Sequence, residues 1–228
     1  IRREKATSNI CTAQVLLAVI ASMYACWHGP DGLRAIASRV NLGARLLAEA
    51  ARALGFAPKH DSYFDTIALD CGARADDVMA AALEKGFNLR RIDAGTVGIS
   101  IDETVTEADL SALTDALAQV AGKPAPALGA APQSIPDALA RRSDFLSAAV
   151  FNAYHAEHEM LRYLKRLQDK DVALDRSMIP LGSCTMKLNA TAEMIPVTMD
   201  GFANIHPFAP AGPTSGYRTM MARLCDFL

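Results

Sequence analysis

The chain has 228 residues, 51% of them hydrophobic and only 6% aromatic, and a formal net charge of −2. This length suits one large domain or two small ones, and the scattered basic residues exclude the clustered positive surface typical of nucleic-acid-binding proteins. Many alanines and few aromatics favour packed helices over a β-sandwich. The five cysteines lie far apart without a CxxC pair, which argues against zinc or a disulfide framework and favours a reducing compartment.

The first third of the chain predicts two successive helices. An apolar helix is expected over residues 10–27, because residues 7–9 offer N-cap side chains. Gln14 and Ser22 interrupt its apolar run, which is also too short to cross a bilayer comfortably. Residues 28–32 should break this helix, and apolar residues spaced three or four apart then predict a long amphipathic helix that ends near Gly55.

The next segment alternates strands and helices. Strands are predicted over residues 62–70, 87–93 and 96–102, the last alternating cleanly between two faces. One helix should follow Asp76 and Asp77, and another should begin at Thr106, which forms a capping box with Asp109. We therefore predict an α+β unit over residues 29–122, with helices on one face of its sheet.

A proline- and alanine-rich stretch then separates this unit from a second helical region. Residues 123–142 have the composition of a linker. A helix is expected from residue 143 to about residue 170, a short helix at 190–197, and a final amphipathic helix from Tyr217. The predicted organisation is thus residues 1–28, the α+β unit, the linker, and residues 143–228.

The most unusual stretch has the sequence SMIPLGSCTMKLN, at residues 177–189. It follows neither a helical nor a strand period, yet it gathers hydroxyl, thiol, amide and ammonium groups. These groups suit a small anionic or amino-acid-like ligand, with Ser183, Thr185, Lys187 and Asn189 as the lining and His206 as a further candidate. The alternative is a polar connection before a helix.

The sequence gives weaker support for a metal site, a nucleophilic cysteine or a nucleotide-binding loop. His155, His158 and Glu159 have metal-compatible spacing on a predicted helix, but such triples are common on solvated helix faces. Cys184 lacks an assignable base for a nucleophile. The spacing of Ser183 and Lys187 is not S-x-x-K, and no GxGxxG or Walker loop is present.

Several stretches together resemble the glycine decarboxylase family, the P-proteins of the glycine cleavage system. The first is REKATSNICTAQ at residues 3–14, and others are HDSYFDT at 60–66 and NLRR at 88–91. The loop at 177–189, EMIP at 193–196 and HPF at 206–208 are similarly specific. The resemblance covers nearly the whole chain, although Asn41 stands where we expect histidine.

This resemblance implies a fragment of a fold-type I, pyridoxal-phosphate-dependent enzyme made of two homologous halves. Residues 1–28 would end the large domain of the first half, the α+β unit would be its small domain, and residues 143–228 would begin the second half. The lysine that carries pyridoxal phosphate would lie beyond Leu228, so no catalytic residue is assigned and the fragment alone should be inactive.

The resemblance also implies the reaction and the partners. Glycine would lose its carboxylate as CO2, and its aminomethyl group would pass to the lipoyl arm of the H-protein. The whole enzyme would be a homodimer or a heterotetramer of two halves, in the bacterial cytoplasm or the mitochondrial matrix. A non-catalytic α+β module that binds a metabolite or a partner is the alternative.

Overall fold

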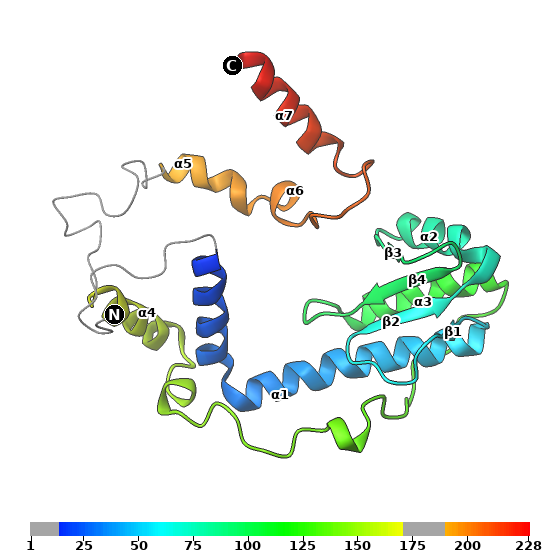
Figure 1. Ribbon diagram of the computed structural model, residues 1–228, viewed down its shortest axis with the longest axis horizontal. Coiled ribbons are helices and arrows are strands. Elements are labelled where there is room, and N and C mark those ends of the chain that lie inside the picture. Colours follow the sequence, from blue (N-terminus) through cyan, green and yellow to red (C-terminus); the bar gives the residue numbers. More distant parts are fainter. Residues whose placement is uncertain (1–13, 171–189) are drawn as a thin grey trace. The chain divides into compact units, whose positions relative to one another are not determined.

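The computed structural model describes residues 14–170 and 190–228 (Figure 1). The chain divides into two compact units. One comprises His28–Ala153, and the other comprises the described parts of Ile1–Trp27 and Tyr154–Leu228. The three predicted boundaries between domains, after residues 28, 122 and 142, remain predictions.

The longest element is helix α1, Gln14–Leu54, which is interrupted at the predicted place. Gly29 has φ 61° and ψ −175°, a conformation that essentially only glycine adopts, and Pro30 follows it directly. Proline suits the first turn of a helix because its missing N–H has no partner there anyway. The predicted break at residues 28–32 is therefore confirmed, but it is confined to Gly29 and the helix resumes at once.

A four-stranded antiparallel sheet follows, in the order β1-β2-β4-β3. Its strands are β1 (Ala57–Pro58), β2 (Thr66–Asp70), β3 (Arg90–Arg91) and β4 (Thr96–Ser100). The central pair places Ile67 opposite Ile99 and Leu69 opposite Val97, and all four side chains are buried. The strand prediction for residues 87–93 is wrong outside the two residues of β3. The two-residue strand β1 was not predicted, and its proline fits an edge strand, where one N–H has no partner in the ladder.

The helices of this unit have the predicted end signals. A 3₁₀ turn (Gly72–Arg74) leads into α2 (Ala75–Glu84), which carries Asp76 and Asp77 in its first turn. Helix α3 (Glu107–Ala121) begins with the predicted capping box between Thr106 and Asp109 and ends at Gly122 with φ 63°. These features confirm the predicted α+β class.

One hydrophobic core joins the sheet to its helices. Buried residues of α1, β2, α2, β4 and α3, and of the turns beside them, form a single cluster. Its largest fully buried apolar members are Phe56, Leu47, Ile67, Leu69, Val78 and Val97. Gly43 allows α1 to approach the sheet and α3, because a Cβ there would lie 3.2 Å from Ile101 Cγ2. The α+β unit therefore has a core of its own, built around α1.

The predicted helix over residues 143–170 is wrong in its first half. Residues 149–152 form a 3₁₀ helix (Ala149–Asn152), and helix α4 spans only Glu157–Gln168. Leu146 has φ 52°, outside the helical region, and the Asn152 amide donates to the carbonyls of Leu146 and Ala148 at 3.1 Å each. This asparagine competes with the helix for backbone carbonyls.

The C-terminal residues form short helices. They are α5 (Thr191–Met194), a 3₁₀ turn (Ile195–Thr198), α6 (Asp200–Ala203) and α7 (Ser215–Phe227). The short helix predicted at 190–197 and the final helix are confirmed. In the described part of the chain, no helix is long and apolar enough to span a membrane.

Candidate functional site

The predicted ligand-binding loop falls outside the described residues. Ser183, Thr185, Lys187 and Asn189 all lie there, so their role as a lining remains a prediction. The chain that leaves this loop is held at its first described residue, where the Ala190 N–H donates to Glu193 Oε2 at 3.1 Å. This bond caps the N-terminus of α5.

His206 is the one predicted lining residue that the structure describes. It is exposed, in the connection between α6 and α7, and its Nδ1 accepts the Phe208 N–H at 3.1 Å. A neutral imidazole that accepts at Nδ1 carries its proton on Nε2. His206 can therefore donate a hydrogen bond to a ligand from Nε2 while Nδ1 holds its own loop.

The start of α7 fixes the loop that carries His206. The Tyr217 hydroxyl donates to the Phe202 carbonyl at 2.6 Å, and the two rings pack edge to face with centroids 5.7 Å apart. Arg218 donates to the Ala211 carbonyl at 2.6 Å. These contacts hold both ends of the connection on α6 and α7, so His206 is presented on a fixed loop.

The three residues with metal-compatible spacing, His155, His158 and Glu159, are not all on one helix. His155 precedes α4, and its Nδ1 lies 2.6 Å from the Trp27 carbonyl, whereas His158 and Glu159 are within the helix. Residues 14–170 and 190–228 contain no group of three histidine, cysteine or acidic side chains placed to hold a metal ion. The shared helical face of the three residues was therefore predicted wrongly.

Sequence reasoning missed an aromatic and cationic cluster beside this histidine. The rings of Tyr154 and Tyr163 stack with centroids 4.2 Å apart, and Arg166 lies over both. Arg166 also donates to the Tyr154 hydroxyl at 2.7 Å. The spacing of Tyr163 and Arg166, three residues apart on a helix, was the available signal. This cluster orders α4 and the residues that lead into it.

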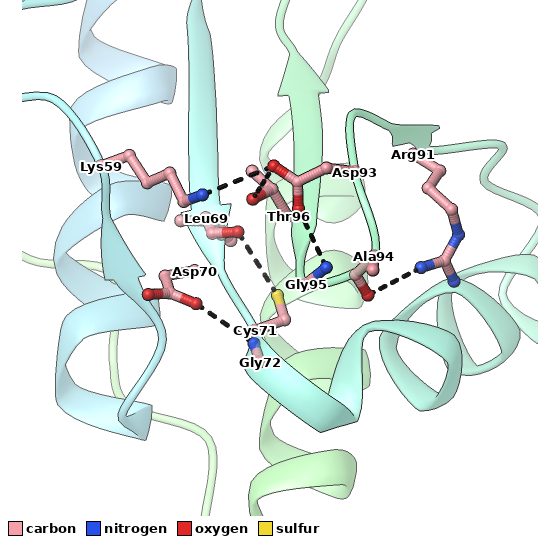
Figure 2. A network of polar contacts seen from close by, with 10 residues as sticks. All are labelled: Lys59, Leu69, Asp70, Cys71, Gly72, Arg91, Asp93, Ala94, Gly95 and Thr96. Carbon is pink, nitrogen blue, oxygen red and sulfur yellow. Dashed lines mark hydrogen bonds and ion pairs between the residues drawn. The ribbon is translucent and has the colours of Figure 1, made fainter.

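A polar network in the α+β unit joins the turn at residues 93–95 to the turn at residues 71–72 (Figure 2). The Asp93 carboxylate accepts the Gly95 N–H at 2.9 Å and the Thr96 hydroxyl at 2.8 Å, and it pairs with Lys59 at 3.5 Å. The Thr96 hydroxyl, the Gly95 N–H and Lys59 all favour the ionised form and lower the pKa of Asp93.

The other side of this network is the turn after β2. The N–H groups of Cys71 and Gly72 both donate to the Gly95 carbonyl, at 2.8 and 3.0 Å. Arg91 extends the network by donating to the Ala94 carbonyl at 3.2 Å and pairing with Asp76 of α2. Because these groups satisfy one another, the network fixes the sheet and does not form a ligand site.

Two of the three described cysteines, Cys26 and Cys71, are buried and do not form a nucleophilic site. Burial raises the pKa of both Cys26 and Cys71, so each stays a thiol at neutral pH. The Cys71 thiol lies 3.7 Å from the Leu69 carbonyl, to which it donates. Cys184 lies outside the described residues.

A comparison with protein families identifies the first half of the chain. The family model described as "Glycine cleavage system P-protein" matches residues 1–117, which is more than half of the chain. The match contains the REKATSNICTAQ, HDSYFDT and NLRR stretches and reaches from before α1 into α3. The loop at 177–189 follows the matched residues. The chain belongs to the glycine cleavage system P-protein family.

Proposed function

We propose that this chain is part of a glycine dehydrogenase of the decarboxylating, aminomethyl-transferring type. The whole enzyme would release the carboxylate of glycine as CO2 and transfer the aminomethyl group to the lipoyl group of an H-protein. The observation that carries this proposal is the family membership of residues 1–117. The α+β unit, with a core of its own, fits the small domain of one fold-type I half.

We assign the binding of glycine to the loop at 177–189. Ser183, Thr185 and Lys187 would donate to the glycine carboxylate, because hydroxyls and an ammonium group are suitable donors for it. Asn189 and the Nε2 of His206 would complete the polar lining. Excluding water from the bound glycine would strengthen each of these hydrogen bonds.

Pyridoxal phosphate, which the family uses, supplies an electron sink when bound. The cofactor must be held by a lysine, and no lysine among the described residues is suited to this role. All described lysines are exposed, and Lys59 and Lys165 form surface ion pairs with Asp93 and Asp169. We propose that the lysine comes from outside this sequence, and that the chain alone is inactive.

The proposed partners follow from the same reaction. They are glycine, a lipoylated H-protein, and a second subunit or half in a homodimer or heterotetramer. Exposed apolar residues of the C-terminal helices support contact with further protein, among them Phe202, Met221, Leu224 and Phe227.

The experiment is to express the full-length protein that contains this chain and record its visible absorbance. The proposal predicts the band of a protein-bound pyridoxal group, and a change in that band when glycine is added. Alanine, which is larger by one methyl group, serves as the control amino acid. A protein that binds neither the cofactor nor glycine would contradict the proposal and favour a non-catalytic α+β module.

A further inference from the structure

The segment at residues 124–136, which we call the strap, is tied to α1 by a buried pair of polar side chains. Asn41 and Ser134 are each only 5% exposed. The Asn41 amide donates to Ser134 Oγ at 3.0 Å and to the Phe64 carbonyl at 2.8 Å, and the Ser134 hydroxyl donates to the Tyr63 carbonyl at 2.7 Å. A stretch with linker composition is thus held at a defined place.

Arg45 holds the strap one helical turn further along α1. Its Nη1 donates to the carbonyls of Ala131 and Pro132, at 3.0 and 3.2 Å. Residues 41 and 45 lie on the same side of a helix because they are four apart. The Arg45 Nε is buried and finds no acceptor among the described residues. This unmade bond opposes closure, because opening the strap would return Nε to water.

The rest of the strap is weakly attached. In the described structure, no backbone-to-backbone hydrogen bond involves residues 124–135. Ser134 is the one buried residue of the strap, and Leu128 packs partly buried against the core. Segments with few buried contacts and few backbone bonds open at low free energy.

Both flanks of the strap have separate anchors. The Lys123 N–H donates to the Ala118 carbonyl at the end of α3, and Lys123 Nζ donates to the Ala53 carbonyl at 3.3 Å. On the other side, the guanidinium groups of Arg34 and Arg141 lie 5.0 and 5.5 Å from the centre of the Phe145 ring. None of these contacts involves Asn41 or Ser134.

We propose that the strap is a conformational latch that opens as one piece when the Asn41–Ser134 hydrogen bonds break. The flanking anchors and the α+β core stay folded during this opening. The open strap would expose the polar side of α1 and the carbonyls of Tyr63 and Phe64. It would also lengthen the free connection between the α+β unit and the residues that follow it.

Thiol labelling of the native full-length protein tests this proposal. Leu128→Cys places a reporter in the strap, and the native Cys71, only 3% exposed, reports on the core. Labelled peptides are identified by mass spectrometry, so other cysteines do not interfere. Where reclosing is fast, the labelling rate follows the population of the open form.

Ser134→Ala and Asn41→Ala are each combined with Leu128→Cys. Both should raise labelling at position 128 at least tenfold, because each removes at least one buried hydrogen bond to the strap. Position 128 should also label faster than Cys71 and depend less on urea, because it needs only the strap to open. Gln133→Ala, at an exposed strap residue, is the matched control and should change neither rate.

Two results would overturn the latch. Equal labelling rates at position 128 and Cys71, with the same dependence on urea, would show that strap and core open together. Unchanged labelling at position 128 in both variants would show that the Asn41–Ser134 bonds do not hold the strap. Ser134→Ala retains the Asn41 bond to Phe64, so it keeps the test decisive if Asn41→Ala does not fold.

Discussion

Gly95 and Gly72 bring two turns of the α+β unit into backbone contact. A Cβ on Gly95 would lie 3.3 Å from Gly72 Cα, and the Gly95 carbonyl accepts the N–H groups of Cys71 and Gly72. Figure 2 shows Gly72 and Gly95 in the two turns. The end of β2 and the start of β4 are therefore locked together by backbone atoms. A side chain at Gly95 would separate them.

Gly95→Ala should destabilise the protein by about 1–3 kcal/mol, because backbone atoms cannot give way as a flexible side chain can. Gly129→Ala is the control, since a Cβ there meets nothing within 4 Å and no positive φ is involved. It should be neutral or slightly stabilising. Urea unfolding measures both variants, and equal stabilities would contradict the contact between the turns.

Thr106→Ala should cost about 1 kcal/mol of folding free energy, within the range for lost N-caps. The Thr106 hydroxyl accepts the Asp109 N–H at 3.2 Å, and the Asp109 carboxylate accepts the Thr106 N–H at 2.8 Å. Ser111→Ala is the control, because Ser111 donates only to the Glu107 carbonyl within α3. Chemical denaturation should separate the two variants, and a control as unstable as Thr106→Ala would argue against the cap.

Acid should weaken the turn at Asp93. The Thr96 hydroxyl, the Gly95 N–H and Lys59 lower the pKa of Asp93 in the folded state. Its stabilisation is therefore fully present above the unfolded value of about 3.9 and is lost as pH falls through the lower folded value. NMR titration should find Asp93 below its ordinary pKa, and closer to it in Thr96→Val. An ordinary pKa in the unmodified protein would refute the network.

The α+β unit was largely predictable because its signals are local. The alternation of Val97, Ile99 and Ile101, the capping box at Thr106 and the glycine at 122 each fix structure within a few residues. The length of strand β3 was overestimated, because only Arg90 and Arg91 pair with β4. Strand pairing depends on tertiary contacts that a local pattern does not contain. The helix predicted from residue 143 failed because Asn152 binds nearby carbonyls instead.

The strap and the candidate site depend on contacts between residues far apart in the chain, which sequence composition does not reveal. Composition predicted a linker at 123–142, and the hydrogen bonds to Asn41 and Arg45 depend on residues about 90 positions away in the sequence. At the candidate site, composition identified the polar residues of the loop, whereas His206 is the member whose hydrogen bonds the structure describes. Composition names possible ligands, but only packing brings them together.

The most direct test measures exchange of the glycine carboxylate with labelled bicarbonate in the full-length protein, supplied with lipoylated H-protein. Ser183→Ala/Thr185→Ala should raise the KM for glycine at least tenfold, because two donors to the carboxylate are lost. Ser111→Ala/Thr219→Ala removes the same two kinds of hydroxyl from exposed helix positions and should leave the exchange unchanged. H-protein-dependent exchange with this difference is the predicted result. No exchange, or equal KM values for the two double variants, would contradict the account.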